Sequence, residues 1–418
     1  MIQNKINIPK LRFKGVDGEL DNKKLSDVFI FFRGKGISRE DIIKDGVNKC
    51  IRYGELYTEY SEIIDNVKSK TNILEKDSLL SKKGDVLIPS SGETAIDIST
   101  VSCVKLDNIL LGGDLNVMRP KDGQNGNFYS YYLSSAKKIS IAKIAQGNSV
   151  VHLYSSHLKN LKINVPLFLE QQKIADFLQV TDSWIENLKQ QKENLKEHKK
   201  GMMQKIFAQE IRFKDENGKE FPDWETKKIG DIGIISTSSV DKKIYDKQKI
   251  VSLLNYMDVY KRDHIFKNDD FQIISASESQ IISANLKKGD ILFTPSSETP
   301  DDIGHSAVVM EDLQDVLFSY HLVRLRPKKN ILDYNFSAYV FKVFYFYKNL
   351  WRKAQGATRF TLSKDAFESS KIIIPTSLTE QQKIADFLTS IDKLLDSKQQ
   401  QIAKAKEWKK GLMQGLFV

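Results

Sequence analysis

Hydrophobic residues recur at alternating steps of three and four in two long segments, residues 167–208 and 376–418. This spacing puts them on one stripe of an α-helix, and about five heptads of such a stripe are typical of a coiled coil. Four stripe positions are lysines, which favours a short two-helix contact or a face that meets a third helix from a partner. The alternative is that each helix packs only on its own neighbouring domain. The stripe consists of Ile174, Leu178, Thr181, Ile185, Leu188, Lys192, Leu195, Lys199, Met202 and Ile206, and of Ile384, Leu388, Ile391, Leu395, Lys398, Ile402, Ala405, Lys409, Leu412 and Leu416.

The start of each helix is marked in the sequence. Pro166 and Pro375 precede the two segments, and Thr379 with Gln382 fits a capping box. The first helix leads from one globular region to the next, so the second must run back to bury the same stripe. The pattern therefore predicts two antiparallel helices of roughly 60 Å, at 1.5 Å per residue. The predicted shape is a dumbbell with an approximate two-fold axis through the helix pair.

The regions outside these helices have the pattern of mixed α/β domains. Short apolar runs bounded by Gly, Ser or Pro predict strands at 85–88, 290–293 and 371–374. Longer stretches predict helices at 129–144 and 335–354. In the second of these, Val340, Phe344, Tyr347 and Trp351 recur at helical spacing, which favours a core helix; a base-stacking aromatic surface is the alternative. The order of the strands does not follow from the pattern.

The chain contains an internal duplication. The sequence EQQKIADFL occurs at Glu170–Leu178 and again 210 residues later, and KKGMMQKIF at Lys199–Phe207 is answered by KKGLMQGLF at the same offset. KKGDVLIPSSGET at Lys82–Thr94 is answered by KKGDILFTPSSET at Lys287–Thr299. The predicted organisation is two homologous α/β domains alternating with two helical spacers: 1–166, 167–208, 209–375 and 376–418.

The composition is that of a folded, soluble protein. The 418 residues suggest two to four domains at roughly 100–200 residues each. Cys50 and Cys103 lie far apart with no zinc-type spacing, so a reducing cytoplasm is the expected compartment, and no apolar run is long enough for a membrane span. The net charge of +10, mostly from the first domain, is compatible with binding to a polyanion.

No familiar catalytic motif is present. The phosphate-binding loop, GxGxxG, HExxH and GxSxG are all missing, and the six histidines are dispersed. Acidic and lysine residues at 222–227 echo a metal-dependent nuclease but stand too close together to converge on one metal. We therefore expect no catalysis, no metal and no cofactor in this chain.

Two pairs of repeated loops are candidates for DNA contact. Each follows a strand or helix and carries hydroxyl, amide or guanidinium groups that can reach phosphates or base edges. The alternative is ordinary turn and cap chemistry. The candidates are Ser90, Ser91, Thr94, Gln146, Asn148 and Ser149 in the first domain, and Ser296, Ser297, Thr299, Gln355, Thr358 and Arg359 in the second.

Together these motifs resemble the specificity subunit of a type I restriction-modification system. The resemblance covers nearly the whole chain and is carried by the two EQQKIA motifs after a proline, the two KKG(M/L)MQ endings, the GD(V/I)L strands, and Arg212-Phe213 with Pro222-Asp223-Trp224. The first domain begins with Leu11–Lys14 but lacks the Pro-x-Trp of the second.

The resemblance implies that two domains each read half of a bipartite double-stranded DNA target and that the helices set the spacer. It also implies that two modification subunits dock on the helices and methylate adenine with S-adenosylmethionine. Restriction subunits would supply translocation and cleavage with ATP and magnesium. The competing interpretations are a coiled-coil scaffold that never touches DNA and a fused methyltransferase or nuclease. A scaffold leaves the divergent loops unexplained, and an enzyme needs the missing motifs.

Overall fold

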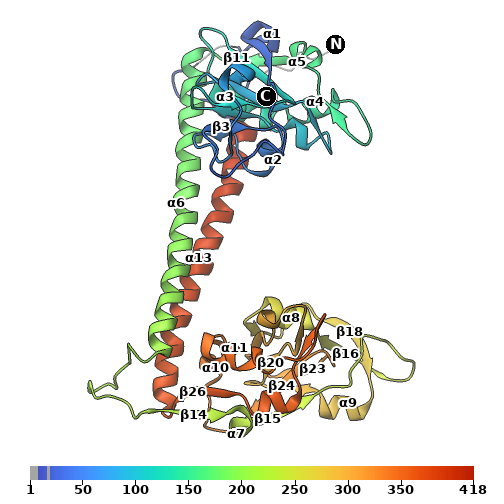
Figure 1. Cartoon of the computed structure of the whole chain (residues 1–418), viewed down its shortest axis with the longest axis vertical. Coiled ribbons are helices and arrows are strands. Elements are labelled where there is room, and N and C mark those ends of the chain that lie inside the picture. Colours follow the sequence, from blue (N-terminus) through green and yellow to red (C-terminus); the bar gives the residue numbers. More distant parts are fainter. Residues whose placement is uncertain (1–7, 17–18) are drawn as a thin grey trace. The chain divides into compact units, whose positions relative to one another are not determined.

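The computed structural model describes residues 8–16 and 19–418. It divides into two compact units, one made of the chain up to Gln190 together with Gln400–Val418, the other of Gln191–Gln399. Each unit holds one globular part and stretches of both long helices, α6 (Phe168–Phe207) and α13 (Leu378–Leu416) (Figure 1). The two units are described one at a time.

The first unit is built on two main sheets. Its five-stranded sheet has the order β2-β11-β7-β9-β4, its four-stranded sheet the order β5-β3-β10-β6, and two short pairs are β1-β13 and β8-β12. The strands are β1 (Asp21–Lys24), β2 (Phe29–Arg33), β3 (Asn48–Ile51), β4 (Ile63–Ile64), β5 (Lys70–Thr71), β6 (Leu79–Leu80), β7 (Val86–Pro89), β8 (Ser91–Gly92), β9 (Ser102–Val104), β10 (Leu110–Leu111), β11 (Leu115–Pro120), β12 (Val151–His152) and β13 (Lys162–Val165). The short helices are α1 (Leu25–Val28), α2 (Glu55–Thr58), α3 (Gly126–Ser135), α4 (Lys138–Lys143) and α5 (Ser155–Lys159).

The second unit repeats this topology strand for strand. Its sheets have the orders β15-β24-β20-β22-β17, β18-β16-β23-β19, β14-β26 and β21-β25. The strands are β14 (Trp224–Lys228), β15 (Gly233–Thr237), β16 (Lys249–Leu254), β17 (His264–Ile265), β18 (Gln272–Ala276), β19 (Asn285–Leu286), β20 (Ile291–Phe293), β21 (Ser296–Ser297), β22 (Ser306–Val309), β23 (Leu313–Phe318), β24 (Val323–Pro327), β25 (Phe360–Thr361) and β26 (Lys371–Pro375). The short helices are α7 (Ile229–Ile232), α8 (Tyr256–Lys261), α9 (Glu278–Ser283), α10 (Tyr334–Val340), α11 (Phe344–Trp351) and α12 (Lys364–Glu368). The fold thus confirms the predicted tandem α/β domains.

The predicted strands at 85–88, 290–293 and 371–374 form β7, β20 and β26. The predicted helices at 129–144 and 335–354 are wrong in one respect, because each is broken into two. The break in the second falls before α11, where Val343 takes an extended conformation and Lys342 turns its ammonium group to Asp263 at 2.5 Å.

This break also corrects the predicted core helix. Val340 is buried in α10, whereas Phe344 begins α11 with 66% of its surface exposed. The buried positions of α11 are Phe346 and Leu350. The hydrophobic spacing in the sequence therefore continues across a break in the helix, and the residues before and after the break have different surroundings.

The long helices pair antiparallel within each unit. In the first unit, Ile185 and Leu188 of α6 form a cluster with Ile402 and Ala405 of α13. In the second, Lys192 of α6 donates to Gln399 of α13 at 2.7 Å, and Lys199, seven residues later, pairs with Asp392, seven residues earlier, so the helices run in opposite directions. No residue of the predicted stripe is classed as exposed in the described chain, which confirms the stripe.

The lysines of the stripe all have acceptors on the opposite helix. Lys199 pairs with Asp392 at 2.5 Å and Lys398 donates to Gln191 at 2.7 Å, both in the second unit. In the first unit, Lys409 pairs with Asp182 at 2.7 Å. The long side chains can therefore line the helix contact because their ammonium groups are satisfied at its edge.

The predicted capping box of the second helix is wrong. Thr379 lies inside α13, and the Ser377 hydroxyl, two residues earlier, accepts the Glu380 amide at 3.4 Å. Gln382 instead donates to Asp386 one turn later.

No helix in the described chain is long and apolar enough to cross a membrane.

Candidate nucleic-acid interface

In the first unit the two candidate loops meet at the short ladder between β8 and β12. Ser91 lies opposite His152, and Gln146 forms a further bridge to His152 on its other side. The Leu153 amide continues the ladder by donating to the Ser90 carbonyl at 2.9 Å. Loops more than 50 residues apart in sequence thus form one surface.

The second unit joins its loops in the same way. Ser296 of β21 lies opposite Thr361 of β25, and Gln355 bridges to Thr361. The Leu362 amide donates to the Pro295 carbonyl at 2.8 Å, as Leu153 does to Ser90. The pairing of the loops is therefore part of the duplicated scaffold.

A glycine fixes the shape of each second loop. Gly147 has φ +118° and Gly356 has φ +139°, values that other residues rarely adopt. A Cβ atom on Gly147 would lie 2.1 Å from the Val150 carbonyl oxygen, and one on Gly356 would lie 2.0 Å from that of Arg359. Both loops turn back so tightly that only glycine fits.

The candidate residues divide by exposure. The hydroxyl residues of the ladders, Ser91, Ser296 and Ser297, are only 7–8% exposed, and Ser90 is half-buried. The other eight lie on the surface: Thr94, Gln146, Asn148, Ser149, Thr299, Gln355, Thr358 and Arg359. Thr94 also opens a 3-10 turn by accepting the Asp97 amide at 3.1 Å. All twelve remain predicted DNA contacts; eight of them are exposed, and the four serines are buried or half-buried at the ladders.

The sequence analysis missed a polar aromatic cluster beside the second ladder. Tyr256 donates from its hydroxyl to the Ser296 carbonyl at 2.7 Å, and Tyr260 stacks on Tyr256 with ring centres 6.0 Å apart. Asp302 accepts from Tyr260 at 3.1 Å and meets His305 Nε2 at 2.8 Å. Desolvation acts to raise the pKa of Asp302, but the hydrogen bonds from His305 and Tyr260 leave it below its ordinary value.

The signal for this cluster was a third repeat. Tyr256 and Tyr260 flank Asp258 just as Tyr53 and Tyr57 flank Glu55, 203 residues earlier. Each acid caps the backbone amide three residues before it, Asp258 that of Asn255 and Glu55 that of Arg52, both at 2.8 Å. The first unit adds His152 and Tyr154, both exposed and stacked with ring centres 6.1 Å apart.

The EQQ motif anchors each long helix to its domain. The buried carboxylate of Glu380 accepts from Arg212 at 3.0 and 3.2 Å and from the Trp224 indole at 3.1 Å. In the first unit, Arg12 donates to Glu170 at 2.7 and 2.9 Å. The first domain lacks an equivalent of Trp224, as the sequence indicated, yet it keeps the bidentate arginine.

The glutamine after each glutamate acts as a second anchor. Gln171 accepts the Asn125 amide and donates to the Pro166 carbonyl, both at 2.9 Å. Gln381 accepts the Asp333 amide at 2.8 Å and donates to the Pro375 carbonyl at 2.9 Å. These bonds connect the start of α6 to α3 and the start of α13 to α10. Each long helix is therefore held against the domain that carries the loops.

Across residues 8–16 and 19–418, no three His, Cys, Asp or Glu side chains gather as a metal site requires. What the geometry offers is hydrogen-bonding and stacking groups on two equivalent surfaces.

Two homologous domains that present divergent polar loops on a shared frame define a two-site recognition protein. The family model of the type I restriction modification DNA specificity domain matches the chain twice, at residues 18–197 and 222–407. The chain therefore belongs to the type I restriction-modification DNA specificity family, with one copy of its domain in each half.

Known relatives agree with this assignment. The type I restriction enzyme MjaVIII specificity subunit of Methanocaldococcus jannaschii is 26% identical over 372 residues, covering 85% of this chain and 83% of the relative. The MjaIX specificity subunit of the same organism is 28% identical over 273 residues, covering 59% and 61%. The crystal structure of the type I restriction-modification S subunit from M. genitalium has the same fold, with a TM-score of 0.57 at 16% identity over 98% of this chain and 99% of that one.

Proposed function

We propose that this chain is the non-catalytic, DNA-reading subunit of a type I restriction-modification complex, and that each unit recognises one half of a bipartite site in double-stranded DNA. The observation that carries the proposal is the contrast between scaffold and loops. The ladders, glycines and helix anchors are the same in both units. Within the equivalent loops, Asn148 and Ser149 of one unit stand where the other has Ala357 and Thr358, and Val150 is replaced by Arg359. Different side chains on one frame are what two different half-sites require.

The exposed groups suit base edges and phosphates. The Gln146 and Gln355 amides can pair with adenine, and the Arg359 guanidinium can bind guanine in a bidentate manner or contact a phosphate. Arg359 Nη2 lies 3.5 Å from the Ser296 hydroxyl, so the guanidinium stays beside the ladder. The stacked tyrosines of α8 extend the same surface.

The partner subunits complete the chemistry. Two modification subunits dock on the helices and carry S-adenosylmethionine for adenine methylation, and restriction subunits bring ATP and magnesium for translocation and cleavage. Two equivalent docking places are supported by the repetition of the helical sequence, since a repeated surface offers the same contacts twice.

An exchange of loops tests whether the two units recognise their half-sites independently. Replacing Gln355–Arg359 with the equal-length Gln146–Val150 sequence, as A357N/T358S/R359V, should change one half of the methylated sequence and leave the other intact. Methylome sequencing of cells carrying the complete system measures both halves at once. The converse exchange, N148A/S149T/V150R, is the matched control and should change the opposite half. If either exchange altered both halves equally, the two units would not read independently.

The non-catalytic role has its own test. The purified chain should transfer no labelled methyl group from S-adenosylmethionine to DNA and should bind DNA only weakly. Adding its modification subunit should produce methylation and tight, sequence-selective binding. Methyl transfer by the isolated chain would contradict the proposal.

A further inference from the structure

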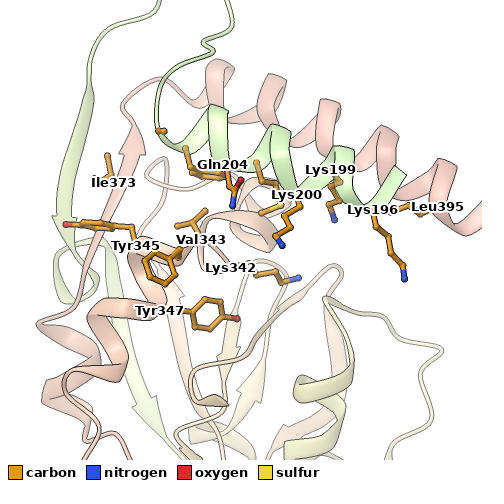
Figure 2. Close-up of a pocket in the computed structure, with 14 residues that line it drawn as sticks. Lys196, Lys199, Lys200, Gln204, Lys342, Val343, Tyr345, Tyr347, Ile373 and Leu395 are labelled. Carbon is orange, nitrogen blue, oxygen red and sulfur yellow. The ribbon is translucent and has the colours of Figure 1, made fainter. Parts of the chain in front are cut away.

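Each unit contains a groove walled by the last turns of one long helix. In the second unit, a cavity of about 880 Å³ lies between the end of α6 and the segment Lys342–Tyr347. Figure 2 shows Lys199, Lys200 and Gln204 directed from α6 toward this segment. Six residues of α6 form the wall: Lys196, Lys199, Lys200, Met203, Gln204 and Phe207.

The first unit has the equivalent groove at the end of α13. Its cavity of about 660 Å³ is walled by six residues that stand 210 positions after their counterparts: Lys406, Lys409, Lys410, Met413, Gln414 and Phe417. All six pairs are identical in residue type. The walls of the two grooves therefore have the same six residue types.

This identity does not extend along the whole helix. Between the identical ends of the repeat, residues 179–195 and 389–405 agree at only three positions, Asp182, Gln190 and Gln191 with their counterparts. Beside the groove, His198 is replaced by Trp408 and Lys205 by Gly415. The six wall positions are thus identical in both copies, as are Glu197 and Gly201 with their counterparts, while these other neighbours differ.

Packing inside the units explains only part of the identity. Lys199 and Lys409 form ion pairs, and Met203 and Phe207 pack against the core. The exposed side chains of Lys200 and Gln204, and of their counterparts Lys410 and Gln414, form no hydrogen bond or ion pair among the described residues. An identical exposed surface in two copies is suited to an identical partner at both places.

The lining of the groove indicates the chemistry of that partner. In the second unit, four lysines and no aspartate or glutamate line the cavity. Lys196, Lys199 and Lys342 pair with acids outside the lining, and Lys200 has no ion pair among the described residues. The apolar part of the cavity includes Val343 and Phe344, the latter 66% exposed. The Lys200 ammonium group beside an apolar floor fits a segment that carries a carboxylate beside an apolar side chain. A DNA backbone would use the cations but would leave the apolar floor uncovered.

We propose that each groove binds an acidic segment with an apolar anchor from one modification subunit, so that two copies of the same partner occupy the two units. This rests on the proposed function and adds the contact surface and the chemistry of the docking segment. The second unit binds its copy more tightly, because its opposite wall is aromatic and apolar. The opposite wall of the first groove consists of Ser134–Ala136 and Glu62, whose carboxylate lies 3.1 Å from Lys409.

Charge reversal in the full-length chain tests this proposal. The wild type and the variants Lys200→Glu, Lys410→Glu and the double variant are titrated with the modification subunit, and native mass spectrometry counts the bound copies. Lys200→Glu should weaken the tighter binding step by about tenfold, Lys410→Glu should weaken the other step, and the double variant both. Lys205→Glu, an exposed reversal on the same helix outside the groove, is the control and should bind like wild type. Equal melting temperatures show that all the chains are folded.

Three results would overturn the docking surface. The first is a double variant that binds two modification subunits with wild-type affinity. The second is a variant that loses affinity for DNA, with the salt slope lower by about one, while its subunit affinity stays unchanged, because the lysines would then contact phosphates. The third is a wild-type chain that binds no modification subunit, which would overturn the proposed function as well. The first two leave half-site reading intact, so the two failures are distinguishable.

Discussion

Gly356 fixes the shape of a loop that is predicted to contact DNA. Alanine at this position must fit a φ of +139° and a Cβ atom 2.0 Å from a carbonyl oxygen, so the loop has to move. We expect Gly356→Ala to cost more than about 1 kcal/mol of unfolding free energy and to abolish recognition of one half-site only. Urea unfolding and methylome mapping measure the two effects.

Gly201 is the matched control in the same unit. It lies inside α6, and a Cβ atom there would meet nothing within 4 Å. Gly201→Ala should therefore raise the unfolding free energy by about 0.5–1 kcal/mol and leave recognition unchanged. Equal effects of the two substitutions on stability and recognition would contradict the expectation that the Gly356 loop accepts only glycine.

Glu380 is the residue on which the anchor of α13 depends. Alanine there leaves the Arg212 guanidinium, 21% exposed, and the Trp224 indole without their shared acceptor. Removing one partner of such a pair costs about 3 kcal/mol, near the lower end for buried pairs because the arginine is partly solvated. Thermal unfolding of Glu380→Ala checks the loss. Asp386→Ala, on the same helix but exposed, should change the stability by less than about 0.5 kcal/mol.

The candidate site shows what could be predicted from single residues. The Gln and Gly residues of the second loops were found because they recur in both copies, and the structure places them on the surface. The ladder serines were predicted because loops of hydroxyl residues follow a strand in both copies, and nothing in the sequence indicates that Ser91 or Ser297 is buried. Burial depends on β8 and β21 pairing with strands about 60 residues away, which is a non-local contact.

At the level of elements, a polar triad holds each long helix to its partner helix and to the domain. Asp392 of α13 accepts from Lys199 of α6 at 2.5 Å and from the Tyr339 hydroxyl of α10 at 2.8 Å. Burial raises the pKa of Tyr339, although the bond with Thr389 opposes this, so the phenol keeps its proton and donates it. Asp182 takes the same position in the first unit, between Lys409 and Tyr131.

This triad predicts a non-additive pair of substitutions. Asp392→Leu alone should lower the unfolding free energy by about 2 kcal/mol, because Lys199 keeps a partly buried charge without its partner. Adding Lys199→Leu should recover part of that loss, since two apolar side chains can fill the contact. A double-mutant cycle by chemical denaturation measures the coupling. Fully additive losses would show that the pair does not act as a unit.

Element prediction succeeded where the signal was local or repeated. The two long helices follow from a stripe about five heptads long, and β7 and β20 from apolar runs between turn residues. The break between α10 and α11 was missed because hydrophobic spacing continues across it, and Lys342 at the break pairs with Asp263, which lies far away in sequence. The strand orders of the sheets depend on such distant contacts throughout, and the sequence pattern contains none of them.

At the level of the whole molecule, the duplication allows residues that hold the fold to be distinguished from residues that serve function. One domain alone would show turn residues and caps with no way to separate frame from contact. Two copies separate them, because positions that hold the fold stay alike, whereas the loop positions 148–150 and 357–359, proposed to distinguish the half-sites, differ. The same comparison identifies a third class, positions such as Lys200 and Lys410 that are exposed and alike but lie outside the candidate loops. These are the positions expected to meet a partner that both halves share.

The helices also predict how the two half-sites are spaced. Four residues inserted after Gln191 add about one helical turn, roughly 6 Å of length, which is nearly two base pairs at 3.4 Å each. A four-residue insertion is also a stutter, so the helix pair can stay packed with a local change in supercoil. If the helices set the spacer, cells carrying the insertion should methylate the same two half-sites at a spacing one or two base pairs longer. If the helices serve only for docking, the spacer should stay fixed and the modification subunit should bind less tightly. Methylome mapping decides between these outcomes, and an unchanged spacer in a fully active complex would rule out the helices as a ruler.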